Sequence, residues 1–148
     1  MIIKLCSCMI LTMLKPGLRQ RQVVSVYDTY ISFYFTGGRI HIQPEALRKI
    51  GCPPYVRFLM SPDGKAMIME PYNRKVFASM RVPKGLYGET VKRFRMEVKC
   101  APFCRLIAHH LGLDESCSYR IQGKVYPSQR IVKYDLNTAY AINSESEE

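Results

Sequence analysis

The cysteine and histidine residues are the side chains of this sequence best suited to metal binding. The six cysteines lie at positions 6, 8, 52, 100, 104 and 117, and no two of them form a Cys-x-x-Cys pair. Zinc could use Cys100, Cys104, Cys117 and one of His109 and His110, since thiolates and imidazoles are its usual ligands. The alternative is that these cysteines are small buried hydrophobic residues. Because the spacings match no zinc module, we expect no bound metal.

A catalytic arrangement is not evident in the sequence. The only histidines are His41, His109 and His110, and no serine or cysteine lies in a nucleophile motif beside a matched acid. Neither a P-loop nor a GxGxxG segment is present. Asp114 and Glu115 are better explained as part of a turn than as a carboxylate pair for acid–base catalysis. We therefore expect a protein that is not an enzyme and that uses no cofactor.

The basic side chains are the remaining candidates for function. The 148 residues include 22 Lys and Arg against 12 Asp and Glu, which gives a net charge of +10. A surplus of this size favours a polyanionic partner, nucleic acid first. The alternative is a small basic protein that binds nothing specific. A hydrophobic content of 47% is ordinary for a globular chain, and the length is enough to bury a core.

The two ends of the chain are expected to add little to the fold. The apolar run 5–14 follows a single Lys4, is too short to span a bilayer and precedes no convincing cleavage site. We expect 1–22 to be a disordered leader or an over-extended start, and 141–148 to be a disordered acidic tail. Without an export signal, we expect a cytoplasmic protein with reduced thiols and no membrane contact.

The elements that position these basic residues are clearest in 37–51. Ile40 and Ile42 alternate with polar neighbours, which predicts a half-buried strand. Pro44 suits the first turn of a helix, because its φ is already fixed and its missing N–H is not needed there. Gly51 is expected to end the helix, since glycine adopts the left-handed conformation easily.

A hairpin is predicted directly after this helix. Residues 55–60 alternate again, with Val56, Phe58 and Met60 on one face. The Ser61-Pro62-Asp63-Gly64 segment then predicts a turn into a second strand at 66–70. Before all of these, 23–35 is rich in β-branched and aromatic residues, which favours a further strand.

This succession resembles the AbrB/SpoVT-like swapped-hairpin family of DNA-binding proteins. The family pattern has a glycine-arginine strand start, an isoleucine-x-isoleucine-proline step, a short basic helix and a hairpin. The matching positions are Gly38-Arg39-Ile40, Ile42, Pro44, Glu45, Arg48-Lys49, Gly51, Asp63-Gly64 and Glu70-Pro71. The resemblance covers about 35 of the 148 residues.

The resemblance implies a DNA-binding transcriptional regulator that contacts DNA mainly through phosphates. Its motif positions imply that Arg39, Arg48 and Lys49 meet DNA, with Arg57 as a weaker neighbour. Arg93 and Arg95 would be the counterparts in the second half of the chain. Such binding is expected to depend strongly on salt.

The second half repeats the order of elements seen in the first. An alternating strand around Met96, a helix opened by Pro102 and closed by Gly112, and strands at 119–125 and 130–136 follow one another about 60 residues later. We therefore expect an α+β, mostly β fold in which two β-α-β-β units, 23–71 and 92–140, form an intramolecular AbrB-like pseudo-dimer barrel. Two such barrels could also associate as a homodimer. Chance alternation in a small α+β protein is the competing explanation.

Residues 72–99, from the end of the first unit into the start of the second, are the most basic part of the chain. Eight of these residues are basic, against Glu89 and Glu97. Turn residues predict that 72–91 is a linker or an exposed lobe. Its basic and aromatic side chains suit either phosphate contact with base stacking or a solvated linker whose aromatics enter the core.

A function of another class is also open. The second half lacks the glycine-arginine and proline-helix pattern, so an internal pseudo-dimer could have lost DNA binding. The chain would then be a small non-catalytic interaction protein, of the kind that a mobile element could encode, that binds a host protein or a nucleotide. A folded barrel that ignores duplex DNA at low salt would favour this alternative.

Overall fold

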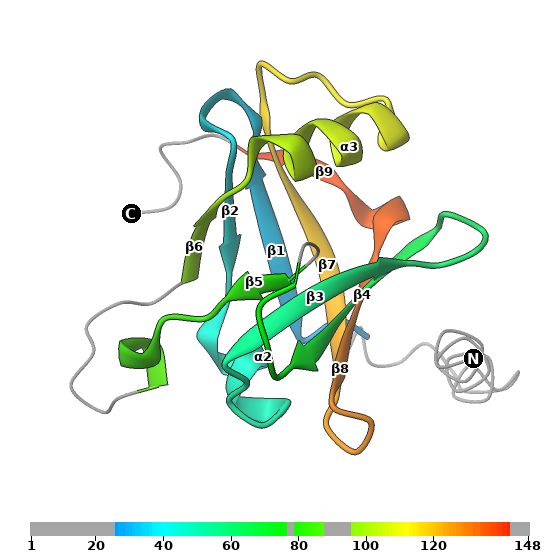
Figure 1. Cartoon of the computed structure of the whole chain (residues 1–148). Coiled ribbons are helices and arrows are strands. Elements are labelled where there is room, and N and C mark those ends of the chain that lie inside the picture. The colour runs from blue at the N-terminus through cyan, green and yellow to red at the C-terminus, as the bar shows by residue number, and fades with distance from the viewer. Residues whose placement is uncertain (1–25, 77–78, 88–95, 143–148) are drawn as a thin grey trace, which may run out of the picture.

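The computed structural model describes residues 26–76, 79–87 and 96–142, and these form a mostly β protein (Figure 1). Eight antiparallel strands follow the order β5-β3-β4-β8-β7-β1-β2-β6 and nearly close into a barrel. The strands are β1 (Thr29–Tyr34), β2 (Arg39–Ile42), β3 (Tyr55–Met60), β4 (Ala66–Tyr72), β5 (Ser79–Arg81), β6 (Met96–Lys99), β7 (Ser118–Tyr126), β8 (Ile131–Asp135) and β9 (Tyr140–Ile142). The short β9 lies outside this order and pairs with β7. The expectation of a mostly β fold is confirmed.

The two helices lie at opposite ends of the barrel (Figure 1). α2 (Pro44–Lys49) has a proline in its first turn, and Gly51 follows it at φ 102°. α3 (Ala101–Leu111) also begins with a proline in its first turn, and Gly112 ends it in the left-handed region at φ 64°. Both helix stops fall on the glycines that the sequence predicts, because a side chain there would be strained.

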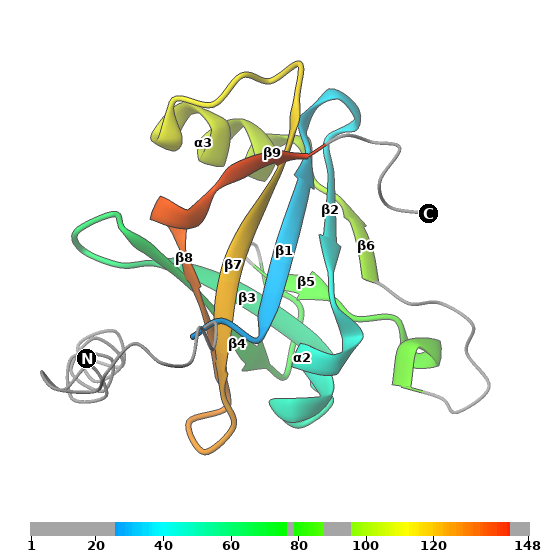
Figure 2. The ribbon, with the colours of Figure 1, turned by 180° about the vertical axis from the view of Figure 1, so that it is seen from behind.

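The barrel interior is filled by the inward-facing residues of alternating strands. Ile31 and Phe33 on β1, Ile40 on β2 and Met69 on β4 are fully buried there. Burial of this apolar surface is the main favourable contribution to folding. Along β2, Arg39 and His41 alternate with the buried Ile40 and Ile42 and are partly exposed. Figure 2 shows the barrel from behind, with the short β9 beside β7.

One cross-strand pair in the core depends on a glycine. Gly123 on β7 faces Tyr134 on β8, whose ring fills the interior and is fully buried. A Cβ atom at Gly123 would lie 2.5 Å from the ring carbon Cδ1 of Tyr134. The hydroxyl of Tyr134 has no hydrogen-bond partner in the described part of the chain, and burial raises its pKa.

The segment between the two expected units contributes a strand to the barrel. β5 lies within 72–91, where the sequence predicts a linker, and pairs with β3 in the register Val56↔Met80. The 3₁₀ turn η2 (Lys84–Tyr87) follows, and Leu86 in this turn is buried. The expected leader 1–22 lies outside the described residues, as do Arg93 and Arg95. The expected tail from residue 141 starts inside β9.

Neither helix in the described ranges has the length and apolar character needed to cross a membrane.

Candidate nucleic-acid interface

Arg39 begins β2 on the outside of the barrel, and its side chain is 43% exposed. It faces Lys99 across the β2–β6 pairing. Its Nη1 atom lies 3.1 Å from Oε1 of Glu97 on the neighbouring strand. Lys99 has no ion pair among the described residues, so this position has two positive charges, Arg39 and Lys99, beside the single carboxylate of Glu97. The local charge is therefore positive.

His41 and Glu97 form the next outward-facing pair of the same two strands. Nε2 of His41 lies 2.9 Å from Oε1 of Glu97, the oxygen that also meets Arg39. The hydrogen bond from His41 lowers the pKa of Glu97, and the nearby charges of His41 and Arg39 lower it further. Glu97 therefore stays ionised and holds both partners in place.

Arg120 extends this surface onto β7, although sequence reasoning did not single it out. It faces Ser32 across the β1–β7 pairing, and its Nε atom donates to Oγ of Ser32 at 3.4 Å. Its guanidinium lies 4.0 Å from the ring centroid of Tyr30, which is a cation–π contact. Arg120 is level with His41 in the register, so Arg39 and Arg120 are two strands and two residues apart, or about 12 Å. We call Arg39, Lys99 and Arg120 the basic face.

The remaining motif residues lie elsewhere. Arg48 and Lys49 belong to α2, at the far end of β2 from Arg39. Nη1 of Arg48 is 3.5 Å from Glu45, and its Nη2 donates to the carbonyl oxygen of Leu86 at 3.4 Å. Lys49 is exposed. The structure thus separates Arg39 from Arg48 and Lys49, which the sequence motif places close together.

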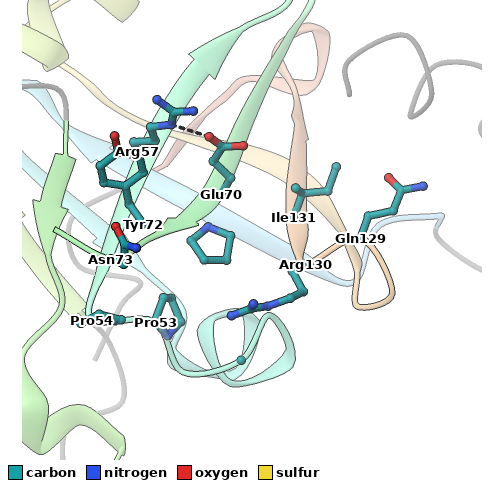
Figure 3. Close-up of a pocket in the computed structure, with 11 residues that line it drawn as sticks. Pro53, Pro54, Arg57, Glu70, Tyr72, Asn73, Gln129, Arg130 and Ile131 are labelled. Carbon is teal, nitrogen blue, oxygen red and sulfur yellow. Dashed lines mark hydrogen bonds and ion pairs between the residues drawn. The ribbon is translucent and has the colours of Figure 1, made fainter. Parts of the chain in front are cut away.

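Arg57 lies on the outer side of β3, away from the basic face. Its Nε atom donates to Oε1 of Glu70, its cross-strand partner on β4. Its guanidinium also lies 4.7 Å from the ring centroid of Tyr72. These residues line one side of an open cleft of about 540 Å³ at the α2 end of the barrel (Figure 3). Arg57 therefore belongs to the cleft.

The cysteines and histidines considered as zinc ligands form no metal-binding group in the described ranges. No three His, Cys, Asp or Glu side chains gather there in a way that could hold a metal ion. Cys104 is buried, which raises its pKa to about 11, and its thiol points to the carbonyl oxygen of Arg39 at 3.8 Å. Nε2 of His110 lies 2.8 Å from the carbonyl oxygen of Gly64. Cys104 and His110 therefore connect α3 to the barrel.

Strand pairing would have been needed to find the basic face from the sequence. Arg120 is an outward position of an alternating strand, which the sequence predicts, but its neighbours Ser32 and Tyr30 are about 90 residues earlier. Comparison with known proteins does not supply this information either. No protein-family model, curated protein or solved structure matches the chain.

Proposed function

We propose that this chain is a non-catalytic, DNA-binding regulator of AbrB-like type, with two β-α-β-β units in one barrel. The observation that carries the proposal is the basic face, on which Arg39 of the family motif is joined by Lys99 and Arg120. The repeated strand registers support the family resemblance, and the positive charge of the basic face supports DNA as the partner.

The strand registers support an internal duplication. Phe58 faces Met69 in the β3–β4 hairpin, and Gly123 faces Tyr134 in the β7–β8 hairpin, sixty-five positions later in both strands. The two hairpins also pair with each other through β4 and β8, where Ile68 faces Lys133 at the same offset. Chance alternation would not be expected to conserve the register of a hairpin and of the contact between hairpins.

The order of strands supports the same interpretation. Exchanging β1 with β5, β2 with β6, β3 with β7 and β4 with β8 preserves every strand pairing except β1–β2. Its counterpart would be β5–β6, and these two strands are the ends of the order, where the barrel does not close. Two copies of the proposed β-α-β-β unit, each preceded by one more strand (β1 or β5) and related by a two-fold axis, would produce this order. The axis would pass between β2 and β6 on one wall and between β4 and β8 on the opposite wall, so the basic face lies beside the axis.

The chemistry of the basic face suits a nucleic-acid backbone. Lysine and arginine contribute most of the affinity for DNA by neutralising phosphates and releasing counterions. Arg39 and Arg120 also lie against the rings of Tyr34 and Tyr30, at 5.7 and 4.0 Å from the centroids. These contacts restrict the guanidinium groups, so less entropy is lost when they bind a phosphate.

A titration with duplex DNA at two salt concentrations tests the proposal. The variants are Arg39→Ala/Arg120→Ala on the basic face and Arg48→Ala/Lys49→Ala on α2. Lys65→Ala/Lys133→Ala is the matched control, because it removes the same charge from the residue before β4 and from β8, away from the basic face. Circular dichroism establishes that each variant is folded.

We expect the basic-face variant to lose about tenfold or more in affinity and the salt dependence to fall by about one to two phosphate contacts. The α2 variant should lose less, and the control should stay close to wild type. An equal loss in all three would show dependence on net charge alone and would contradict a defined basic face. Salt-independent binding, or no binding by wild type, would exclude a DNA-binding function.

A further inference from the structure

The cleft at the α2 end of the barrel has a second arginine that the proposed DNA surface does not use. The cleft is enclosed by the loop after α2, the end of β4 and the turn before β8, and it measures about 540 Å³. Arg57 and Tyr72 stand on one side, and Arg130 reaches across from the β8 side toward Pro53 (Figure 3). A cleft of this size is within the range of small-molecule sites.

The backbone of Arg130 is unusual for an arginine. Its φ of 56° lies in the left-handed region, which residues other than glycine seldom adopt. The preceding hairpin has glycine, Gly64 at φ 70°, near the matching place in its turn. Unfavourable conformations kept in a structure tend to accompany functional sites. An arginine held in this conformation therefore suggests a use for its side chain.

The side chain of Arg130 is fixed in position and its charge is not neutralised. Nε donates to the carbonyl oxygen of Ile50 at 3.1 Å. A Cβ atom at Gly51 would lie 2.8 Å from Nη2, so the guanidinium packs directly against this glycine. Among the described residues no carboxylate pairs with Arg130, whereas Arg57 is paired with Glu70. The cleft thus holds one cation in excess.

The other walls of the cleft indicate the chemistry of the rest of a ligand that carries an anionic group. Pro53, Pro54 and Pro71 give rigid apolar surface, and Tyr72 and Asn73 add an aromatic ring and an amide. A guanidinium binds a carboxylate or a phosphate through two parallel N–H donors. We propose that this cleft binds a small organic anion, whose carboxylate or phosphate meets the Nη groups of Arg130 and whose apolar part lies against the prolines.

Side-chain and backbone NMR of the folded protein tests this site with two probes, inorganic phosphate and benzoate. Each probe is titrated at constant ionic strength against sodium chloride, and the signals of Arg130 Nε–Hε and Gly51 N–H are followed. The variants are Arg130→Gly, which suits the left-handed backbone, and Arg130→Gln, which keeps much of the side chain. Lys65→Gln is the matched control, because Lys65 occupies the corresponding position after the first hairpin turn.

In wild type and in Lys65→Gln, we expect saturable shifts at Gly51 with at least one probe. In both Arg130 variants the affinity for that probe should fall at least tenfold. Absence of saturable shifts in wild type would overturn the proposal, as would unchanged affinity in the Arg130 variants.

Duplex DNA distinguishes a small anion from a phosphate of the DNA backbone. If the site serves small anions, the Arg130 variants bind duplex as wild type does, and duplex does not displace the probe. Loss of duplex binding in these variants together with displacement of the probe would show that DNA occupies the cleft, and would overturn the small-molecule assignment.

Discussion

Each of the two hairpin turns of the barrel contacts a helix or the residues after it. In the first the contacting side chain comes from the helix, and in the second it comes from the turn. The first turn closes with a bond from Gly64 N to Ser61 O at 2.9 Å, and the second with one from Gln129 N to Tyr126 O at 3.1 Å. At the first turn, the side chain of His110 on α3 reaches the backbone of Gly64. At the second, the side chain of Arg130 reaches the backbone of Ile50 after α2.

This difference teaches that backbone register and surface chemistry can diverge independently. α3 has 11 residues and α2 has 6, so α3 extends far enough to contact its turn with its own side chain. The shorter α2 leaves space beside the second turn, and the cleft occupies this space. The first junction is thus closed by the contact of His110 with Gly64. The second leaves an open cleft beside Arg130, whose charge has no carboxylate partner among the described residues.

The largest expected effect concerns the core pairs of the two hairpins. Phe58 and Met69 face each other in the first, whereas Gly123 and Tyr134 do so in the second. Because a Cβ atom at Gly123 would overlap the buried Tyr134 ring, Gly123→Ala should lower the free energy of unfolding by about 2–3 kcal/mol, measured by chemical denaturation. Gly85→Ala is the control, since nothing lies within 4 Å of a Cβ there. Equal stability of Gly123→Ala and wild type would mean that the two core pairs are not packed differently.

Smaller and unequal effects on stability are expected at the two turns. Gly64→Ala should destabilise by about 1–2 kcal/mol, because it strains a backbone at φ 70° and places a Cβ atom 2.8 Å from the His110 ring. The free energy of unfolding of Arg130→Gly should stay within about 0.5 kcal/mol of wild type. Glycine adopts the left-handed backbone without strain, and this gain offsets the lost hydrogen bond to Ile50. Denaturation of both variants measures this. A large loss in Arg130→Gly would show that the second junction is structural, like the first.

The smallest effect concerns Glu97, which pairs with Arg39 beside the basic face, whereas Arg130 in the cleft has no carboxylate partner among the described residues. The pKa of Glu97 is lowered, so its contribution to stability is present above its unfolded pKa of about 4.3 and is lost as the pH falls through the lower folded pKa. The side chain is 44% exposed, so this contribution is at most about 0.5 kcal/mol. Glu97→Gln should flatten the stability profile on the acid side, as the pH falls below the unfolded pKa of about 4.3. A profile identical to wild type would contradict the contact with His41 and Arg39.

Local sequence signals predicted the elements that short-range preferences control. The alternation around Ile40, the prolines in the first turns of both helices and the glycines at 51 and 112 are all found where expected. β5 was missed, because three residues, Ser79–Arg81, are too few to show a periodic pattern. Its strand geometry depends on pairing with β3, which the local sequence does not reveal.

The candidate sites depended still more on distant contacts. Arg39 and the net charge were evident from the sequence, but the ion pair with Glu97 joins residues fifty-eight positions apart. Arg130 and Gly51 meet only after the second hairpin folds beside α2. The sequence by itself thus determined the class of fold, the ends of the helices and the excess of positive charge, because these depend on local backbone preferences and on composition. Only the tertiary structure decided which cations share a surface, because closing a barrel brings together strands that are far apart in the chain.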